Sequence, residues 1–513
     1  MMTQVELIKA GVPIEKIDLL SREELTQLFK FEQVFRIKLQ KEVEHLRSLT
    51  EELKQKTFLI EDQYVVLKNK FFGKSSERSP KKSGDDSGSN KTKIKKIKVQ
   101  LPSERYPDAP LIERHVELKD LPQCNCCGGK MKDSGMTEDS EFLTVIPKQY
   151  IIIVQMRHKY RCSNCHGDIV TAPPPPRIKE GSSYSDEMMV DVGLTKYCDL
   201  VPIDRYSQMA GREGLSDLPP QSLIETTHYL ADFTKEAYDK LKTEISESSV
   251  LHADETPHRM LEGDEKTNWY LWGFSTPKTS YFEYHDTRSG DVASEVLINS
   301  QCQYLVSDVF SGYAKAVRDA NEIRVQKGQP QILNVYCNAH ARRKFNEAKD
   351  NFPDNAEFFI DQYSKIYHLE NQARGQPPDL VKKLRLQMIP HYEAMKTKAM
   401  ATMAGYSGKS SIAKAMAYFL GNLNELTLFL KNGDLPIDNN PQERLLRNPV
   451  IGRKTWYGTH SKKGAQTAAI LFSLVESCKL NKINPRVYFK TLIQHLHQKK
   501  PAFTPAQFKT LSN

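Results

Sequence analysis

The sequence predicts a multidomain α+β protein, and three observations lead to this expectation. Residues 21–70 contain no Gly or Pro and are rich in Leu, Glu, Lys and Gln, which is typical of a long helix. Two Cys-x-x-Cys pairs follow, at residues 124–127 and 162–165. Beyond residue 247 short strand patterns alternate with helical ones, which indicates a sheet with covering helices. A length of 513 residues leaves room for about two to four domains.

The N-terminal region, residues 1–73, is predicted to be helical with a coiled-coil seam. Alternating steps of four and three from Leu39 give a series in which seven of nine positions are apolar. The series is Leu39, Val43, Leu46, Thr50, Leu53, Thr57, Ile60, Tyr64 and Leu67. A narrow apolar stripe on a charged helix suits a partner helix, so we expect a homo-oligomer formed through this coiled coil. The alternative is a long helix that packs on its own protein.

Positive charge gathers in two zones of the chain. The net charge is +9, yet residues 74–98 hold nine Lys/Arg against three Asp/Glu, and residues 444–500 hold twelve against one. Localised positive charge on an otherwise acidic body favours a polyanionic partner, and nucleic acid is the first candidate. Residues 74–99 read as a flexible basic linker, because they lack the apolar residues needed for a core. The linker is either a solvated tether or a contact for phosphates.

Residues 100–180 are predicted to form a zinc ribbon. Four thiolates in two Cys-x-x-Cys pairs, Cys124 with Cys127 and Cys162 with Cys165, suit one tetrahedral structural zinc. Residues 142–146 and 150–156 read as strands between the pairs. The alternative to zinc ligands is that these are small buried cysteines at turns, a role that would not require two Cys-x-x-Cys pairs.

The N-terminus shows no secretory pattern, and the longest strongly apolar run, Ala468 to Val475, is too short to cross a membrane. A cytoplasmic protein without a membrane partner is therefore expected, and a reducing cytosol favours metal binding over disulfides for the paired cysteines. Residues 181–247 read as helices, with segments 203–215 and 221–233 on either side of a turn. This pair is either a helix-turn-helix reader of duplex DNA or plain helical packing.

The second half of the chain is predicted to hold a catalytic domain, residues 248–349 and 431–470. The expected elements are strands at 250–253, 269–274 and 281–284, a helix at 291–298, a strand at 304–307, a helix at 313–320 and a strand at 332–336. Three strands, a helix, a strand, a helix and a strand is the order of a ribonuclease-H-like fold. Residues 350–430 read as a helical insertion, and residues 471–513 as a basic C-terminal helical tail.

Two predicted strands of this domain end at carboxylates. Asp254 follows the first strand and Asp308 the fourth, so we expect them side by side at a site for a hard divalent cation. Glu443 offers a third acid in the first turn of a helix that we expect Asn440 to cap. The alternatives are turn-forming roles for the two aspartates and a capping-box role for the glutamate.

Several ordered blocks of the chain resemble one family of proteins. They are Phe71-Phe72-Gly73-Lys74-Ser75-Ser76-Glu77, the paired cysteines, His252-Ala253-Asp254-Glu255-Thr256, Asp308 with Gly312-Tyr313, Cys337-x-x-His340-Ala341-Arg342-Arg343-Lys344-Phe345, and Ile437-Asp438-Asn439-Asn440 leading to Glu443-Arg444, Arg447 and Gly452-Arg453-Lys454. These blocks are similar to those of bacterial DDE transposases of the insertion-sequence sixty-six family, over nearly the whole chain.

The resemblance implies a catalytic triad of Asp254, Asp308 and Glu443 that holds two Mg²⁺ or Mn²⁺ ions. It implies cleavage and strand transfer at the ends of the protein's own element, with double-stranded DNA of the ends and the target as partner, nucleoid association when bound, and accessory proteins from the same element. Two other functions stay open: a catalytically inactive, sequence-specific DNA-binding protein, and a ribonuclease-H-like nuclease that cuts without joining.

Basic residues near the predicted triad are candidates for DNA contacts. They are Arg342, Arg343, Lys344, Arg444, Arg447, Arg453 and Lys454. The alternative for these residues is a solvated basic surface. Cys337 and His340 also have the spacing of metal ligands, but no second pair accompanies them nearby in the sequence.

Overall fold

The structure is a computed structural model of the full chain. It describes residues 21–23, 26, 30, 33–34, 36–44, 46, 50, 101–113, 116, 123, 126–127, 130, 140–146, 148–161, 163–164, 169–261, 268–406, 408 and 410–511. The chain divides into two compact units, residues 1–143 and 144–513. In the first unit the described residues between 22 and 50 are helical, and α3 (Pro102–Arg105) follows.

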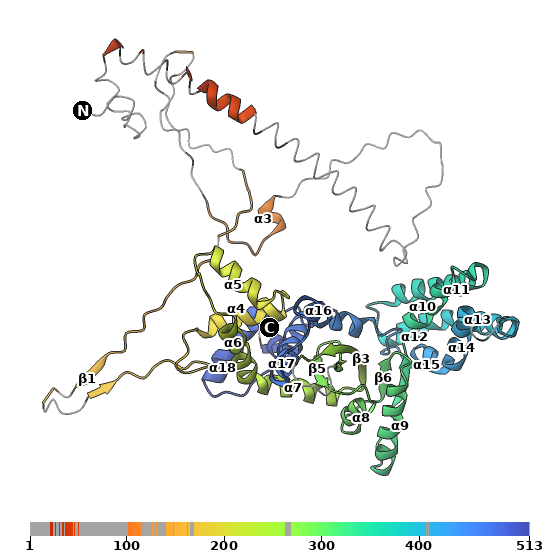
Figure 1. The fold of residues 1–513 in the computed structure, drawn as a ribbon. Coiled ribbons are helices and arrows are strands. Elements are labelled where there is room, and N and C mark those ends of the chain that lie inside the picture. The colour runs from red at the N-terminus through yellow and green to blue at the C-terminus, as the bar shows by residue number, and fades with distance from the viewer. Residues whose placement is uncertain are drawn as a thin grey trace. The chain divides into compact units, whose positions relative to one another are not determined.

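The second unit contains all the named strands and the remaining named α-helices (Figure 1). In chain order they are β1 (Lys159–Arg161), β2 (Ile169–Thr171), α4 (Asp186–Tyr197), α5 (Ile203–Arg212), α6 (Pro220–Phe233), α7 (Lys235–Glu247), β3 (Val250–Arg259), β4 (Asn268–Ser275), β5 (Ser280–His285), α8 (Asp291–Ile298), β6 (Tyr304–Ser307), α9 (Ser311–Gln326), β7 (Leu333–Tyr336), α10 (Asn338–Ala348), α11 (Pro353–Ala373), α12 (Pro378–Arg385), α13 (Ile389–Thr402), α14 (Ser411–Gly421), α15 (Leu423–Thr427), α16 (Asn440–Trp456), α17 (Lys462–Leu480), α18 (Pro485–His497) and α19 (Pro505–Leu511).

A five-stranded mixed sheet with the order β5-β4-β3-β6-β7 organises this unit. β3, β4 and β5 pair antiparallel, whereas β3 with β6 and β6 with β7 pair parallel. The mixed helical and sheet fold expected from the sequence is therefore confirmed. The parallel half brings the carboxyl ends of β6 and β7 to one edge of the sheet, where polar residues that follow these strands can meet.

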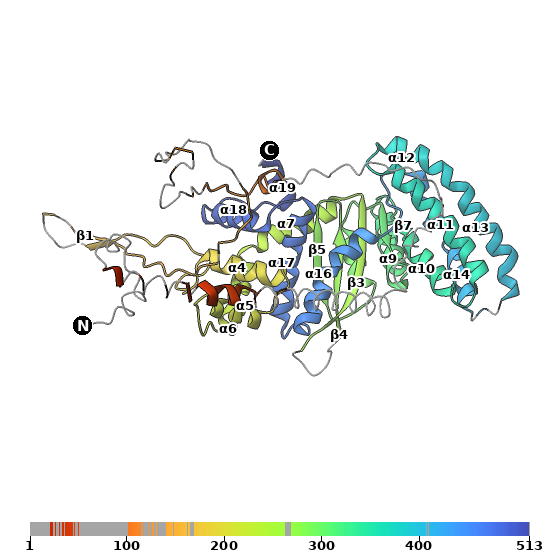
Figure 2. The same ribbon diagram turned by 90° about the horizontal axis from the view of Figure 1, so that it is seen from above.

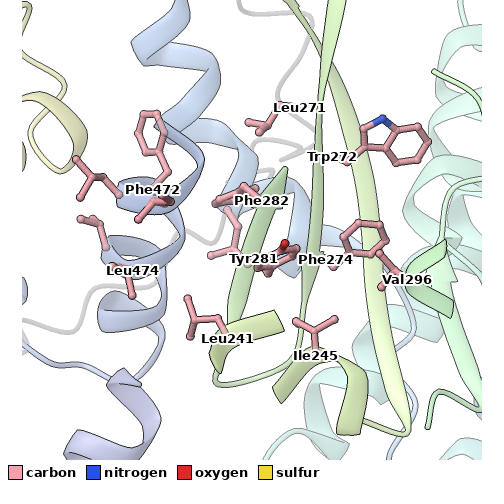
Figure 3. Packing of buried hydrophobic residues seen from close by; sticks show 14 of the residues in the cluster. Leu241, Ile245, Leu271, Trp272, Phe274, Tyr281, Phe282, Val296, Phe472 and Leu474 are labelled. Atoms are coloured by element: carbon pink, nitrogen blue, oxygen red, sulfur yellow. The ribbon is translucent and has the colours of Figure 1, made fainter. Parts of the chain in front are cut away.

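The core consists of apolar residues on both faces of the sheet. Figure 3 shows Phe472 and Leu474 of α17 beside Phe282 of β5, and Leu241 of α7 below them. Trp272 of β4 packs edge-on against Tyr313 of α9. α17 is apolar nearly all round and almost fully buried between 465 and 478, which is why it reads as a continuous apolar run in the sequence.

Two serines of α17 close the free edge of β5. Ser473 Oγ accepts a hydrogen bond from the Phe282 N–H at 2.9 Å, and Ser477 Oγ accepts one from the Ser280 N–H at 2.9 Å. Ser477 also donates to the Ser280 carbonyl at 3.1 Å. An edge strand exposes backbone donors and acceptors, so these serines satisfy groups that would otherwise be buried without partners.

Ser473→Ala should lower the free energy of unfolding by about 1–3 kcal/mol, because it leaves the buried Phe282 N–H without an acceptor. Chemical denaturation measures the change. Ser364→Ala, at an exposed helical serine, is the matched control and should stay within about 0.5 kcal/mol of wild type. An equal effect of the two substitutions would contradict the edge-closing role.

The helices between β7 and α16 form a second core next to the parallel half of the sheet (Figure 2). Phe345 of α10 stacks on Phe359 of α11 with ring centroids 4.2 Å apart, and Phe419 of α14 lies against both. The buried Arg385 of α12 pairs with Glu370 at 2.6 Å and donates to the carbonyls of Phe429 and Asn432. Residues 350–430 are thus largely helical.

Three expectations require correction. Asp254 lies inside β3, which continues to Arg259 because β4 still pairs with it after β6 has ended. The expected strands at 142–146 and 150–156 are not strands in the described residues: β-branched residues favour a strand, but no partner pairs with them, and they lie exposed. Finally, α17 crosses the expected boundary at 470/471 as one buried helix, so no domain ends there and residues 471–480 are not a tail.

Other expectations fall partly or wholly outside the described residues. Leu39, Val43 and Leu46 of the predicted coiled-coil series are helical and exposed, whereas most later positions of the series are not described. The linker at 74–99 is not described either. The helices of 203–215 and 221–233 are α5 and α6, and α6 buries one face against the body. None of the described helices is both long and apolar enough to cross a bilayer.

Candidate active site

Asp254 and Asp308 lie at the junction between the antiparallel and parallel halves of the sheet. The parallel pairing of β3 with β6 ends with His252 opposite Val306. Two residues further along, Asp254 lies within β3 and Asp308 directly follows the end of β6, so the two aspartates come from neighbouring strands of the sheet. Asp308 Oδ1 also accepts a hydrogen bond from the Phe310 N–H at 3.1 Å, so the expected turn-forming role of this aspartate exists alongside its position at the strand end.

Glu443 lies in the first turn of α16, which packs on β3. The helix begins one residue earlier than expected: Asn439, not Asn440, is the N-cap residue, and its carbonyl accepts from the Glu443 N–H at 3.1 Å. The Asn440 N–H is bonded to Asp438 Oδ1 at 3.2 Å. The capping-box alternative for Glu443 is therefore wrong, because the donor that a capping box needs is already taken.

Asn439 fixes the start of α16 against the sheet. Its side-chain amide donates to the Ala253 carbonyl at 2.8 Å, and its Oδ1 lies 2.8 Å from His252 Nδ1. Its backbone N–H donates to Cys337 Sγ at 3.1 Å. Because Asn439 is fully buried and bonded to the residue before Asp254, it holds the helix that carries Glu443 next to that aspartate.

The negative charges of the neighbouring carboxylates act on Asp254. Burial, and in addition the negative charges of Glu255, Asp308 and Glu443, raise the pKa of Asp254 from its ordinary value to about 8. The Glu255 N–H bonded to Asp254 Oδ1 at 2.9 Å offsets this only in part. The structure thus brings the three predicted acids into one electrostatic cluster that a bound cation would relieve.

A network of hydrogen bonds around Glu255 could not be predicted from the sequence. Arg288 donates to Glu255 Oε1 from two nitrogens at 2.8 and 2.6 Å, and the Tyr313 hydroxyl donates to Glu255 Oε2 at 2.6 Å. The Arg288 guanidinium stacks on the Phe310 ring at 4.1 Å and remains half-exposed. Arg288 is therefore a positive group held beside Asp308. Its position in the loop after β5 gave no pattern that sequence alone could connect to Asp254.

The other side of the cluster is formed by the start of α10. His340 Nδ1 lies 3.6 Å from Glu443 Oε1, and an Arg343 guanidinium nitrogen lies 3.8 Å from Glu443 Oε2. Cys337, His340 and Glu443 place one ligand atom each within 4.8 Å of one another. Within the described part of the chain this is the only group of three such residues that close together, so the two aspartates do not join Glu443 at that distance.

Gly273 makes room for the start of α16. It lies opposite Asp254 in the pairing of β3 with β4. A Cβ at this position would come within 2.2 Å of the fully buried Gln442 Nε2 and 3.0 Å of the Phe282 ring. The absence of a side chain at position 273 therefore leaves room for the buried Gln442 side chain, next to Glu443, to pack on the sheet.

Gly273→Ala should move α16 and with it Glu443, at a cost of about 1–3 kcal/mol in stability. The rate of any metal-dependent reaction at the site should fall by more than the loss of stability explains. Gly421→Ala is the matched control, because a Cβ there meets no atom within 4 Å. Thermal unfolding and activity measured on the same preparations test the expectation, and unaltered activity in Gly273→Ala would refute it.

The predicted DNA-contacting residues lie on α10 and α16, the helices that carry His340 and Glu443. Arg444, Arg447 and Lys454 are exposed on α16, whereas Arg453 is half-buried and donates to Thr256 Oγ1 at 3.2 Å. On α10, Arg343 is exposed near Glu443, Arg342 lies over the Tyr367 ring, and Lys344 lies 4.6 Å from the centre of the Tyr418 ring.

Of the predicted zinc ligands only Cys127 is described, and it is exposed; Cys124, Cys162 and Cys165 lie outside the described residues.

A carboxylate cluster where the antiparallel and parallel halves of a mixed sheet meet, with arginines nearby, is typical of metal-dependent enzymes that act on phosphodiesters. Comparison with known proteins narrows this class. Residues 181–467, more than half of the chain, match the model of the family described as Transposase IS66 family. Residues 122–166, which include all four paired cysteines, match the zinc-finger binding domain of transposase IS66. The chain therefore belongs to the IS66 transposase family, a family of DNA-processing enzymes.

Three proteins of Sinorhizobium fredii are similar to most of the chain. The protein named y4hP is 25% identical over 415 residues, which cover 76% of this chain and 73% of y4hP. y4jD is 25% identical over 387 residues, covering 73% of this chain and 74% of y4jD. y4qI is 25% identical over 417 residues, covering 79% and 76%. The family and its zinc-finger domain imply that the chain binds DNA and zinc and uses a divalent metal.

Proposed function

We propose that this chain is a DDE transposase that cleaves and joins DNA at the ends of an insertion sequence. Asp254, Asp308 and Glu443 are the proposed catalytic acids. The observation that carries the proposal is the convergence of their charges, which together with burial raises the pKa of Asp254 to about 8. Acids at three distant points of the chain gain nothing in stability from such an arrangement, so a functional reason is needed.

The proposed catalytic domain is ribonuclease-H-like. Its support is the sheet order β5-β4-β3-β6-β7 with an antiparallel half and a parallel half, followed by a helix that returns to β3 with the third acid. The helices from α11 to α15 separate β7 from α16, and we propose that they are an insertion into this domain.

Mg²⁺ or Mn²⁺ fits the cluster, because carboxylate oxygens are the ligands that these ions prefer and no positive group among the described residues offsets the charge of Asp254. Asp254 and Asp308 would hold one side of the metal site and Glu443 the other. When bound, a pair of such ions activates the attacking hydroxyl and stabilises the leaving oxygen of a phosphodiester.

Arg288 and the basic side chains of α10 and α16 would bind and orient the DNA backbone. Arg288 is rigid, since Glu255 and Phe310 hold its guanidinium, so it can position a phosphate beside Asp308. Arg343, Arg444, Arg447 and Lys454 are exposed and can follow the strand outside the site. We propose further that the zinc module binds the element ends, that the coiled coil makes the homo-oligomer, and that the complex associates with the nucleoid.

An assay with labelled element ends and a target duplex tests the proposal. With Mg²⁺ or Mn²⁺ the protein should release 3′ ends and join them to the target, and both products should vanish with EDTA. Cleavage without joining would instead identify a nuclease, and binding without cleavage an inactive DNA-binding protein. The affinity of the protein for DNA should fall steeply as the salt concentration rises, because each phosphate contact releases counterions.

A further inference from the structure

The start of α10 and the start of α16 place a thiol, an imidazole and a carboxylate around one point. Cys337 is the N-cap residue of α10, His340 lies in its first turn, and Glu443 lies in the first turn of α16. One ligand atom from each lies within 4.8 Å of the other two. The three residues come from segments about a hundred positions apart, so the grouping is made by the fold and not by the Cys-x-x-His spacing alone.

Two of these ligand atoms lack hydrogen bonds although they are buried. His340 Nδ1 and Glu443 Oε1 are both inaccessible to solvent, and neither has a hydrogen-bond partner among the residues that the structure describes. They lie 3.6 Å apart, which is longer than a good hydrogen bond. Two ligands on one tetrahedral zinc ion, each about 2.1 Å from the metal, are separated by about 3.4 Å. The pair therefore has the spacing of two ligands on one ion.

We propose that Cys337, His340 and Glu443 form a binding site for a thiophilic divalent transition metal, with Zn²⁺ as the natural ion. A mixed set of sulfur, nitrogen and oxygen ligands selects zinc or its neighbours and discriminates against Mg²⁺. The side chains of His340 and Glu443 are about a quarter exposed (26% and 28%), so a fourth position can be filled by water. The Asn439 N–H, bonded to Cys337 Sγ at 3.1 Å, supports the thiolate.

The site shares Glu443 with the proposed magnesium site, and this gives zinc a regulatory effect. A zinc ion bound between α10 and α16 occupies Glu443 Oε1 and draws the carboxylate toward His340. The same carboxylate is then less available to complete the metal site at Asp254 and Asp308. Zinc should therefore inhibit Mg²⁺-dependent strand transfer. This consequence rests on the proposed function, whereas zinc binding itself does not.

Cobalt(II) titration of the full-length protein, with the zinc module already loaded with zinc, tests the site. Co²⁺ bound by a thiolate gives a near-ultraviolet charge-transfer band, and a tetrahedral ion gives intense visible bands. Wild type should bind one ion with these bands, Cys337→Ser should lose the charge-transfer band, and His340→Gln should weaken binding about tenfold or more. Cys198→Ser is the matched control, a cysteine outside the cluster, and should keep the bands.

Absence of the bands in wild type, or their persistence in Cys337→Ser, would overturn the proposal. Thermal unfolding shows whether each variant is folded, and His340→Gln keeps the test valid if Cys337→Ser does not fold. The strand-transfer assay then measures the rate of each protein with and without zinc, and the rate with zinc is divided by that protein's own zinc-free rate. Zinc should inhibit wild type more than it inhibits Cys337→Ser or His340→Gln. Cobalt binding without any strand transfer would support the proposed zinc site and contradict the transposase function. Strand transfer without cobalt binding would support the transposase function and contradict the zinc site.

Discussion

Asp308→Asn is expected to lower the rate of DNA strand transfer by about a thousandfold or more. The amide keeps the shape of the side chain and can still accept the hydrogen bond from the Phe310 N–H, but it removes the charge of a proposed metal ligand. Metal-ion catalysis supplies several kcal/mol of transition-state stabilisation, and each 1.36 kcal/mol is a factor of ten in rate. Single-turnover joining of labelled element ends measures the loss.

The matched control for this substitution is Asp291→Asn. Asp291 is also an aspartate next to a strand–helix connection of the same domain, but its carboxylate is exposed and pairs with Lys315. Loss of a surface ion pair costs at most about 1 kcal/mol and should leave joining within a few-fold of wild type. Joining by Asp308→Asn within tenfold of wild type would show that this aspartate does not hold a catalytic metal.

Asp254→Asn should have opposite effects on stability and on activity. In the metal-free protein the unfolded chain releases the Asp254 proton near pH 3.8 and the folded protein near pH 8. Between these values the folded state holds the extra proton, so the free energy of unfolding falls as the pH rises from about 4 to about 8. An asparagine has no such proton. At pH 8 in EDTA the variant should be more stable than wild type by about 2–5 kcal/mol.

Divalent metal should reverse this order. Mg²⁺ bound by the ionised cluster stabilises wild type by mass action, and this effect should grow as the pH rises toward 8, because binding displaces the Asp254 proton. Asp254→Asn should show little stabilisation by Mg²⁺ and no strand transfer. Denaturation curves at pH 5 and pH 8, with EDTA and with Mg²⁺, give the free energy of unfolding of each protein under these four conditions. Equal stability of the two proteins in EDTA at pH 8 would refute the raised pKa.

Much of the sheet could be predicted from the sequence because its elements are short and locally coded. The helix at 291–298 and the strand at 304–307 were predicted with the bounds that the structure shows. Asp308 directly follows that strand, so its place could also be predicted. The extension of β3 beyond Asp254 could not be predicted, because it depends on pairing with β4 across the turn.

The surroundings of the acids were harder to foresee, because they are made by contacts between distant segments. Asn439 was expected outside the helix start, yet its buried amide joins α16 to β3 at Ala253. Glu255 belongs to a block of similarity in the sequence, and only the fold shows that Arg288 pairs with it and that the Tyr313 hydroxyl donates a hydrogen bond to it. The Cys337 and His340 pair lacked a partner within reach in the sequence, and the structure supplies Glu443 from α16.

Manganese binding tests the central claim most directly. Mn²⁺ is titrated at pH 8 into the full-length protein with its zinc module loaded, and bound ions are counted by electron paramagnetic resonance. Wild type should bind two ions per chain close enough for their spins to couple, since the two ions of such sites lie about 3.5–4 Å apart. The triple variant Asp254→Asn, Asp308→Asn, Glu443→Gln should bind neither. Equal manganese binding by wild type and the triple variant would contradict the convergence of these acids on a catalytic metal site.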